Sequence, residues 1–360
     1  MEAILLVGGQ GTRLHPLTLT VPKPMLPVVN ATLTQHQIAM AKAHGIDRII
    51  LGTSYKADVF EAVLGDGSHL GVEIEYAFEP EPLGTGGAIR NAASKLISGP
   101  TDPVAIFNGD ILSQVDITQL VQVFYRHNAD VILYLTRVKD PKNFGLVPTA
   151  LDGRVITFTE KPQSDAEIIT DQINAGVYIF KRSVIEEIPE GIVSSVERDV
   201  FPQFLRDDFK VYADVQDCYW LDLGTPQSFI QGAGDLILER FFSPIFQSNN
   251  FLYWADPSAQ ISPTAVITGG SALARGCVIG SNNQISASVL MQSVQTGAEV
   301  IIENSIISSD ARISDGVSIK DSVIGAGAKI AAGARLEKCQ VWPEFEVTGE
   351  FHNAEKMSQI

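Results

Sequence analysis

Cysteine is scarce in this sequence. The three cysteines, Cys218, Cys277 and Cys339, are odd in number and far apart along the chain. Such spacings match neither a zinc-binding pattern nor a disulfide framework. Thiols that stay unpaired are typical of proteins in a reducing compartment. The sequence therefore predicts a cytoplasmic protein without structural disulfides.

Long apolar runs are also lacking. No stretch approaches the roughly 18 consecutive apolar residues of a membrane-spanning helix, so a membrane is not an expected partner. The first residues, MEAILLVGG, pass straight into a glycine-rich turn without a basic leader. That start differs from a signal peptide, and none is predicted.

Positive charge is in deficit. Lys and Arg number 26 against 42 Asp and Glu, which leaves a net charge of −16 at pH 7. A field of this sign repels nucleic acid and anionic lipid. Nucleic acid is therefore not an expected partner, and a phosphate-bearing ligand has to be attracted by a local cationic pocket or by a metal ion.

What is present is the composition of a folded protein, with 45% hydrophobic residues over 360 positions, a length that suggests two domains. Short apolar runs alternate with helical patterns in the first part of the chain. This alternation predicts an α/β domain over residues 1–240 with a doubly wound, mostly parallel, Rossmann-like sheet. Strands are expected at 3–7, 48–53, 72–77, 104–107, 131–136, 155–159 and 176–180, and helices at 33–44, 58–63, 85–96, 118–126 and 225–240.

The second part of the chain has a different pattern, in which an aliphatic residue recurs every six positions. The residues in phase are Ile261, Ile267, Leu273, Ile279, Ile285 and Met291, then Ile301, Ile307, Ile313 and Ile319, then Ile324, Ile330 and Leu336. This period fits neither a helix nor a two-sided strand, but it fits a triangular coil whose short faces each bury one aliphatic side chain. The pattern predicts a left-handed hexapeptide β-helix over 255–345, after a linker at 241–254 and before a tail at 346–360. A chance run of aliphatic residues in a β-sandwich is the alternative, and the number of positions in phase disfavours it.

A glycine-rich segment near the N-terminus carries the strongest indication of chemistry. The string VGGQGTRLHPLT follows a predicted strand and is followed by PKPM. Glycines let the backbone approach a bound group closely and point several N–H groups at it. Arg13 offers a planar fork suited to phosphate oxygens, and Lys23 stands between two prolines that stiffen its backbone. The segment is neither a Walker A motif nor a dinucleotide fingerprint. We interpret it as a phosphate-binding loop rather than a tight turn with solvated basic side chains.

Other polar residues follow predicted strands, and their residue types alone leave their roles open. Asp110 comes just after the apolar run 104–107, and Asp222 lies in YWLDLGT. The carboxyl ends of parallel strands are where such sheets bind ligands, yet each aspartate could equally be a turn residue or a helix cap. Glu160 and Lys161 begin an EKP string that is either a surface ion pair or part of a binding pocket.

Taken together, the strings resemble the sugar-phosphate nucleotidylyltransferases over essentially the whole chain. The motifs that carry the resemblance, in order, are GGQGTRLHPLT, PKPM, EPLGTGGAIRNA, FNGDIL, NFGLVP, EKP, NAGVYIF, SVERDVFP and YWLDLGTP. Two departures stand out, because relatives often have Arg in place of His15 and a proline near Thr32. The first is expected to weaken nucleotide affinity, and neither changes Arg13 or Lys23.

The resemblance implies transfer of a nucleotidyl group to a sugar 1-phosphate with release of pyrophosphate. It implies that Mg²⁺ is the cofactor, held by Asp110 and Asp222, and that these two residues act in catalysis with Arg13 and Lys23. The nucleotide-binding residues that it implies are Leu6, Gly8, Gly9, Gly11, Thr12, Arg13, Lys23, Glu81, Pro82, Gly84, Thr85 and Gly109. The sugar-phosphate-binding residues are Gly145, Glu160, Lys161 and Asn174.

Substrate choice also rests on the resemblance. The EPLGTGG string is similar to that of the guanylyl branch, which implies GTP and mannose 1-phosphate, with Glu79 or Glu81 accepting hydrogen bonds from guanine. Alternatives are ATP or dTTP with glucose 1-phosphate, or a non-catalytic regulatory subunit. A β-helix that transfers acyl groups usually needs a histidine base, and residues 251–350 contain no histidine. The β-helix is therefore expected to be structural or to form a homo-oligomer.

Overall fold

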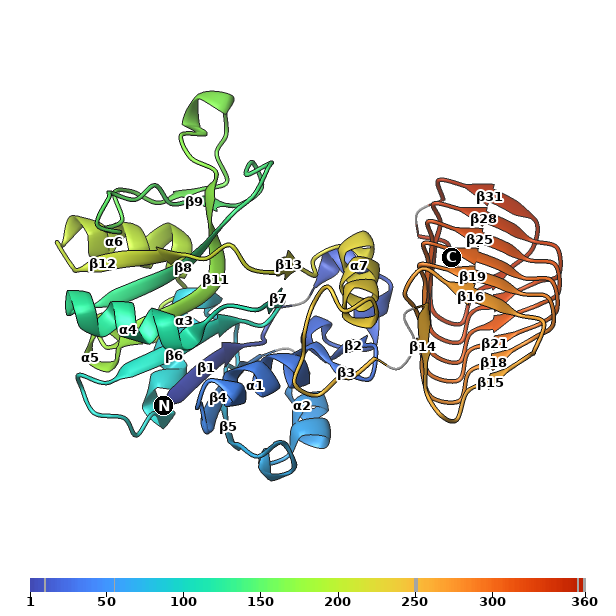
Figure 1. The fold of residues 1–360 in the computed structure, drawn as a ribbon, viewed down its shortest axis with the longest axis horizontal. Coiled ribbons are helices and arrows are strands. Elements are labelled where there is room, and N and C mark those ends of the chain that lie inside the picture. The colour runs from blue at the N-terminus through green and yellow to red at the C-terminus, as the bar shows by residue number, and fades with distance from the viewer. Residues whose placement is uncertain (10, 55, 249–251, 355, 359–360) are drawn as a thin grey trace. The chain divides into compact units, whose positions relative to one another are not determined.

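The computed structural model describes residues 1–9, 11–54, 56–248, 252–354 and 356–358 (Figure 1). The chain divides into two compact units. The first comprises Met1–Gly9 and Gln37–Trp220, and the second comprises Gln10–His36 and Leu221–Ile360. The division at residue 240 into domain, linker and tail stays a prediction, and parts of the predicted linker (249–251) and tail (355, 359–360) lie outside the described residues.

The first unit is built on a nine-stranded sheet in the order β10-β9-β11-β6-β1-β4-β5, and β8 and β12 extend it from β11. The strands are β1 (Glu2–Leu6), β4 (Arg48–Thr53), β5 (Glu73–Phe78), β6 (Pro103–Asn108), β8 (Val131–Arg137), β9 (Gly145–Leu146), β10 (Thr159–Glu160), β11 (Gln172–Lys181) and β12 (Val211–Val215). Strands β10 and β11 run opposite to the other strands. The predicted, mostly parallel sheet is thereby confirmed.

Helices cover both faces of this sheet. They are α1 (Leu33–Ala43), α2 (Ala57–Leu64), α3 (Gly84–Ala92), α4 (Ile117–His127), α5 (Arg182–Ile185) and α6 (Phe201–Arg206). Successive side chains of a strand point to opposite faces. Ile4 and Ile106 share a buried cluster with Ile89 of α3, whereas the neighbouring Ala3 and Phe107 face α1. The sheet is therefore doubly wound, as predicted.

One predicted strand is wrong. The stretch 155–159 contributes only Thr159 to a named strand, β10, while Val155 makes an isolated bridge with Thr149. Val155 and Phe158 are nonetheless buried, at 4% and 9% exposure. Their apolar character reflects packing into the core of the unit rather than pairing in a sheet.

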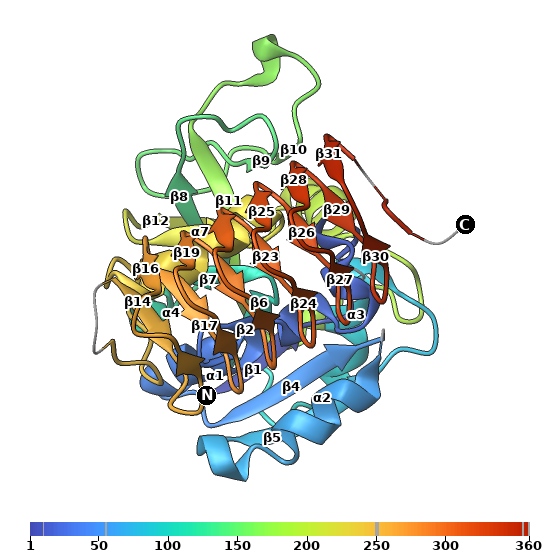
Figure 2. The ribbon, with the colours of Figure 1, turned by 90° about the vertical axis from the view of Figure 1, so that its right-hand side faces the viewer.

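The second unit contains a coil of three parallel sheets with six strands each (Figure 2). The first sheet has β14 (Tyr253–Ala255), β17 (Ser271–Leu273), β20 (Val289–Leu290), β23 (Ile306–Ile307), β26 (Val323–Ile324) and β29 (Gln340–Val341). The second has β15 (Gln260–Ile261), β18 (Val278–Ile279), β21 (Gln295–Thr296), β24 (Arg312–Ile313), β27 (Lys329–Ile330) and β30 (Glu346–Val347). The third has β16 (Val266–Thr268), β19 (Gln284–Ser286), β22 (Ile301–Glu303), β25 (Ser318–Lys320), β28 (Arg335–Glu337) and β31 (Glu350–His352). This arrangement is consistent with the predicted left-handed β-helix.

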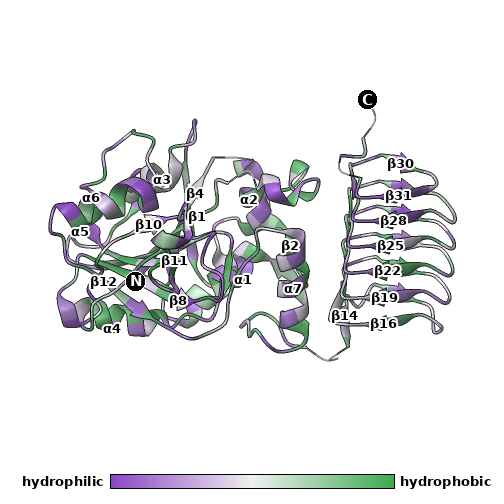
Figure 3. Cartoon of the chain, turned by 90° about the horizontal axis from the view of Figure 1, so that it is seen from above, coloured by the Kyte–Doolittle hydropathy of each residue, from purple (hydrophilic) through white to green (hydrophobic). Residues whose placement is uncertain are grey.

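The length of the turns corrects the predicted phase of the repeat. Tyr253 pairs with Ser271, 18 residues on, but Val289 pairs with Ile306 only 17 residues on. One side of each later turn is thus a residue shorter than six. At the predicted position Ile301 the side chain is 38% exposed, and the neighbouring Ile302 is fully buried in its place. The coil strands accordingly alternate hydrophobic and hydrophilic residues (Figure 3).

A ladder of small polar residues lies at one corner of the coil. The backbone N–H groups of Ser288, Ser305, Ser322 and Cys339 each donate to the hydroxyl of the serine 17 residues earlier, at 3.0–3.2 Å. These buried serines are at most 2% exposed. A buried backbone N–H needs an acceptor, so the ladder supplies one where the chain turns the corner.

Helix α7 (Pro226–Ile237) also belongs to the second unit, and it confirms the helix expected at 225–240 apart from its last turn. Its N-terminus carries a capping box between Thr225 and Ser228. Gly234 on α7 lies against Gly270, where a Cβ atom would come within 2.9 Å of the Gly234 Cα. Side chains at these two positions would push α7 away from the coil.

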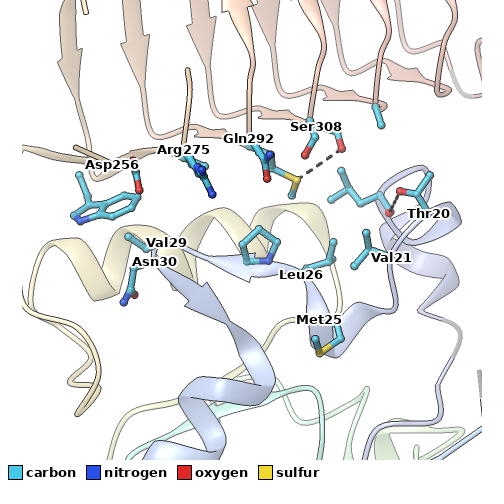
Figure 4. Close-up of a pocket in the computed structure, with 17 residues that line it drawn as sticks. Thr20, Val21, Met25, Leu26, Val29, Asn30, Asp256, Arg275, Gln292 and Ser308 are labelled. Carbon is cyan, nitrogen blue, oxygen red and sulfur yellow. Dashed lines mark hydrogen bonds between the residues drawn. The ribbon is translucent and has the colours of Figure 1, made fainter. Parts of the chain in front are cut away.

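The glycine-rich loop of the second unit continues into three 3₁₀ turns, Thr12–Leu14, Leu17–Leu19 and Lys23–Met25, and a hairpin of β2 (Pro27–Val28) and β3 (Ala31–Thr32). A pocket of about 410 Å³ lies between this segment and the coil. Figure 4 shows loop residues such as Met25 and Leu26 on one side and coil residues such as Arg275, Gln292 and Ser308 on the other. The turn that carries Lys23 is therefore adjacent to the coil.

All three cysteines are free thiols, and two of them, Cys277 and Cys339, are buried in the coil. None of the helices in the described part of the chain is long and apolar enough to cross a membrane.

A buried histidine makes the stability of the second unit depend on pH. His36 is fully buried, its Nε2 donates to the Val28 carbonyl at 2.9 Å, and its Nδ1 accepts from the Ser243 hydroxyl at 2.7 Å. Burial lowers the pKa of His36 from 6.5 to about 4. The unfolded chain therefore binds the proton more readily than the folded chain.

We expect the free energy of unfolding to fall by up to about 3 kcal/mol as the pH is lowered from above 6.5 to about 4. Urea denaturation of the wild type and of His36→Gln across this range measures the effect. The variant should be less stable at pH 7 and should lose the His36 part of the pH dependence, whereas the exposed control His69→Gln should retain it. Equal slopes in His36→Gln and the wild type would contradict the assignment.

Candidate active site

The carboxyl ends of β1 and β6 meet through two glycines. The Gly109 N–H donates to the Leu6 carbonyl at 2.9 Å, and a Cβ at Gly109 would lie 2.4 Å from that oxygen. A Cβ at Gly8 would lie 2.7 Å from the Ser54 hydroxyl, which donates to the Gly8 carbonyl. Residues larger than glycine would force these strand ends apart. Asp110 follows directly and is half-buried.

Gly9 has a different environment from Gly8. A Cβ at Gly9 would meet no described atom within 4 Å. Packing within the described chain therefore does not explain this glycine, and the open space leaves room for a ligand beside the backbone.

In the second unit, the loop is closed by contacts between its two ends. Gly11 has a φ of 63°, and a Cβ there would lie 2.8 Å from the Cβ of Lys23. The Thr18 hydroxyl donates to the Gly11 carbonyl at 2.9 Å. Glycine is needed here for both its positive φ and the close approach of Lys23. Thr12 and Arg13 follow in the first 3₁₀ turn, and both are exposed.

Two cations of this loop lie beside Asp222, the last residue of β13 (Trp220–Asp222). The Lys23 Nζ is 3.5 Å from one carboxylate oxygen, and an Arg13 nitrogen is 3.8 Å from the other. The Lys23 side chain is only 8% exposed, whereas that of Arg13 is 65% exposed. Gly224 makes room for Arg13, since a Cβ there would lie 2.7 Å from the guanidinium. The structure thus brings together three predicted catalytic residues.

The predicted base-binding segment begins helix α3. Glu81 and Pro82 are exposed just before the helix, while Glu79 is 4% exposed and accepts from the Leu83 N–H at 2.9 Å. Burial raises the pKa of Glu79, and the hydrogen bond from Leu83 acts in the opposite direction. Of the two glutamates expected to contact guanine, Glu79 is already used in part to hold the turn.

The glycines of this segment contact the protein itself. A Cβ at Gly84, whose φ is 72°, would lie 2.5 Å from the Ser194 carbonyl oxygen. Gly86 donates its N–H to the same oxygen at 2.8 Å, and a Cβ at Gly87 would lie 2.7 Å from the Ile192 carbonyl oxygen. Within the first unit these glycines therefore serve close packing against residues 192–194. The assignment of Gly84 to nucleotide binding remains a prediction.

The predicted sugar-phosphate residues gather around the short strands β9 and β10. Gly145 pairs with Glu160 across these strands. A Cβ at Gly145 would lie 2.8 Å from a Glu160 carboxylate oxygen and 2.9 Å from the Phe158 ring. Lys161 has a φ of 49°, and its Nζ is 3.9 Å from Glu160. Its side chain is 57% exposed and points a cation toward solvent, as a phosphate ligand would require.

Glu160 has a perturbed charge state. Burial raises the pKa of Glu160, and the negative charge of Glu197 raises it further, whereas Lys161 and Arg198 lower it. Perturbed carboxylates of this kind cluster at functional sites. Glu160 is thus a candidate acceptor for sugar hydroxyl groups.

Asn174, on the long strand β11, completes the predicted sugar side. Its amide donates to the Tyr178 hydroxyl at 2.8 Å, and its carbonyl oxygen accepts from the Gly176 N–H at 3.2 Å. Nearby, the Trp220 indole donates to the Ala175 carbonyl at 2.9 Å. These bonds fix both ends of the Asn174 side chain.

Sequence reasoning missed Glu197, which hydrogen-bonds the hydroxyls of Thr85, Ser195 and Tyr178. Its string, SVERDVFP, contributed to the resemblance but suggested no role for the residue. The indication that could have found it is the isolated pair of acidic residues between apolar positions, Glu197 and Asp199, just before α6.

The fold and these two clusters define a nucleotidyltransferase, and comparison with known protein families agrees. The Nucleotidyl transferase family model matches residues 2–238, and the chain belongs to this family. A model described as the GMPPB C-terminal domain matches residues 251–357. The predicted family resemblance is confirmed.

Individual relatives indicate one kind of nucleotidyltransferase. The mannose-1-phosphate guanylyltransferase of Mycobacterium tuberculosis is 46% identical over 304 residues, which are 84% of this chain and 83% of that protein. The mannose-1-phosphate guanylyltransferase catalytic subunit beta of Drosophila pseudoobscura is 35% identical over 274 residues, which are 75% and 71% of the two proteins. The crystal structure of HddC from Yersinia pseudotuberculosis complexed with GMP-PN has a TM-score of 0.56 and 28% identity, over 64% of this chain and 97% of that chain.

Nucleotidyltransferases of this kind generally use a divalent metal ion. Among the residues that the structure describes, no group of three or more His, Cys, Asp or Glu side chains is placed to hold a metal. Mg²⁺ in nucleotide sites typically takes one or two carboxylates, with water and phosphate supplying the remaining oxygens. The hard oxygens of Asp110 and Asp222 fit this kind of site, which needs no larger protein cluster.

Proposed function

We propose that this chain transfers the guanylyl group of GTP to mannose 1-phosphate and releases pyrophosphate, giving GDP-mannose. The observation that carries the proposal is the 46% identity to a mannose-1-phosphate guanylyltransferase over 84% of the chain. The cluster of Lys23, Arg13 and Asp222 supports it, because it places two cations on a loop suited to phosphate.

The reaction needs positioning and charge neutralisation more than proton transfer. The attacking phosphate oxygen is already ionised at pH 7, so no strong general base is required. The main barrier is the approach of two polyanions and the charge that builds on phosphorus. Arg13 and the N–H groups of the glycine-rich loop bind the β- and γ-phosphates, which leave as pyrophosphate. Lys23 stabilises the crowded α-phosphate.

The acceptor is held by the sugar side. Lys161 binds the phosphate of mannose 1-phosphate, while Glu160 and Asn174 accept or donate hydrogen bonds to the hexose, and Gly145 leaves space beside Glu160. The nucleotide assignments at Leu6, Gly8, Gly9, Gly109, Glu81, Pro82 and Thr85 belong to the same proposal.

Asp110 and Asp222 are the carboxylates that we assign to Mg²⁺. A bound magnesium ion supplies charge neutralisation on the nucleotide phosphates. In the chain itself, Asp222 is beside Lys23 and Arg13, so these cations already offset its negative charge.

The β-helix is assigned a structural and oligomeric role. The last sheet strands expose edges at the open end of the coil, and association would cover them. We propose a homo-oligomer assembled through this domain, and a cytoplasmic location that agrees with three free thiols.

The proposal is tested by measuring pyrophosphate release with GTP, ATP, UTP and dTTP, each with mannose 1-phosphate and with glucose 1-phosphate, in the presence of Mg²⁺. We expect strong turnover for GTP with mannose 1-phosphate alone. Preference for another pair would keep the reaction and overturn the substrates. Nucleotide binding without turnover for any pair would favour a regulatory subunit.

A further inference from the structure

Glu197 lies at a junction in the first unit that the proposed reaction does not use. It belongs to a π-helical turn, Val196–Val200. One of its carboxylate oxygens accepts from the Thr85 and Ser195 hydroxyls, each at 2.9 Å. The other accepts from the Tyr178 hydroxyl at 3.4 Å. One carboxylate therefore joins the start of α3 to strand β11.

The contact with α3 is reciprocal. The Val196 N–H donates to the Thr85 hydroxyl oxygen at 2.8 Å, while the same hydroxyl donates its proton to Glu197. A hydroxyl that receives one hydrogen bond and gives one has a fixed orientation. Glu197 is thereby held against the segment assigned to the nucleotide.

The contact with β11 determines how Asn174 is oriented. Tyr178 is fully buried, and its hydroxyl has one proton. Because that proton goes to Glu197, the hydroxyl oxygen accepts from the Asn174 amide at 2.8 Å. The Asn174 carbonyl oxygen then accepts from the Gly176 N–H. Without the Glu197 acceptor, the Tyr178 proton is free to turn toward Asn174.

Glu197 also acts on Glu160 through its charge. The charged groups that act on Glu160 are Glu197, Lys161 and Arg198. Beside burial, Glu197 is the group that raises the pKa of Glu160, against the two cations.

From this arrangement we infer that Glu197 is a positioning residue for the sugar phosphate: it orients Asn174 through Tyr178 and holds the sugar side of the site to α3. The inference rests on the proposed function, in which Asn174 and Glu160 bind the hexose.

The test is steady-state kinetics of Glu197→Gln in the full chain, with Glu190→Gln as the matched control. Glu190 is a carboxylate of the same unit that pairs with Arg90, and its side chain is 79% exposed. We expect Glu197→Gln to raise the KM for mannose 1-phosphate about tenfold, as loss of a hydrogen bond to a charged group does. The KM for GTP should change by less than about twofold, the step that separates positioning from general damage. Glu190→Gln should match the wild type.

A pH profile distinguishes positioning from a merely structural role. The acidic limb of kcat/KM for mannose 1-phosphate should move to lower pH in Glu197→Gln, because Glu160 loses a neighbouring negative charge. Titration of the substrate phosphate is common to both enzymes, so the difference reports the protein. Tyr178→Phe breaks the path to Asn174 without changing charge. It should raise the same KM and leave the acidic limb in place.

Wild-type kinetics in Glu197→Gln would overturn the inference. Equal changes in both KM values, with an unmoved acidic limb and a lower melting temperature, would also overturn it and show a structural role. If the wild type itself fails to turn over GTP with mannose 1-phosphate, the proposed function fails instead, before any variant is compared.

Discussion

Replacing Lys23 with alanine is expected to lower kcat by about 10²–10³-fold, the usual cost of removing one preorganised group that stabilises transition-state charge. Lys23 is suited to this role because its ammonium is nearly buried on a stiff turn between two prolines. A charge in such surroundings is stronger than one in water. Pyrophosphate release at saturating GTP and mannose 1-phosphate measures the effect.

The matched control for this change is Lys42→Ala. Lys42 pairs with Asp47 on the surface, and its side chain is 43% exposed. The control should retain wild-type kcat, and Lys23→Ala should retain the wild-type circular dichroism spectrum. Near-wild-type turnover in a folded Lys23→Ala protein would contradict the role of Lys23 at the α-phosphate.

Replacing Arg48 with methionine is expected to lower the free energy of unfolding by about 3–5 kcal/mol, the cost of leaving a buried carboxylate without its cation. Arg48 is 7% exposed and Glu2 is 6% exposed. They pair across β1 and β4, with Arg48 donating to Glu2 at 2.5 Å and to Glu73 at 3.1 Å. It also pairs with Glu75. Urea denaturation measures the loss.

Two further variants test the reason. The exposed pair of Arg137 and Asp171 is the control, since Arg137→Met should cost no more than about 1 kcal/mol. In the double variant Glu2→Gln with Arg48→Met, the glutamine oxygen can still accept from the Ser98 N–H that Glu2 accepts from at 2.6 Å. That variant should recover part of the loss. Equal losses in Arg48→Met and Arg137→Met would contradict the buried-charge explanation.

The sheet shows how far a local pattern reaches. Apolar runs and helical periods located most strands and helices within a few residues, because each pattern follows from which face of its own element is buried. The pattern failed at 155–159, where Val155 and Phe158 are buried without lying in a strand. Hydrophobicity alone cannot separate these two cases.

The coil shows the same limit in its phase. A period near six is visible in the sequence because each face buries one residue. The exchange of Ile301 for Ile302 is not visible, because it depends on turns of 17 residues and on the corner where serines bond to serines one turn away.

The candidate site divides in the same way. The residue types of the loop, with Gly11, Arg13 and Lys23, were recognisable because they are close together in the chain. The role of Gly84 in packing against Ser194 was not, since that contact joins segments far apart in sequence.

By itself, the sequence determined the two fold classes, the phosphate-binding loop and the family, because composition, periodicity and contiguous motifs are local properties. Only the tertiary structure decided that Lys23 lies beside Asp222 and that Glu197 joins Thr85 to Tyr178. Those contacts depend on how the chain closes on itself, and a hydrogen bond or an ion pair between distant residues leaves no period in the sequence.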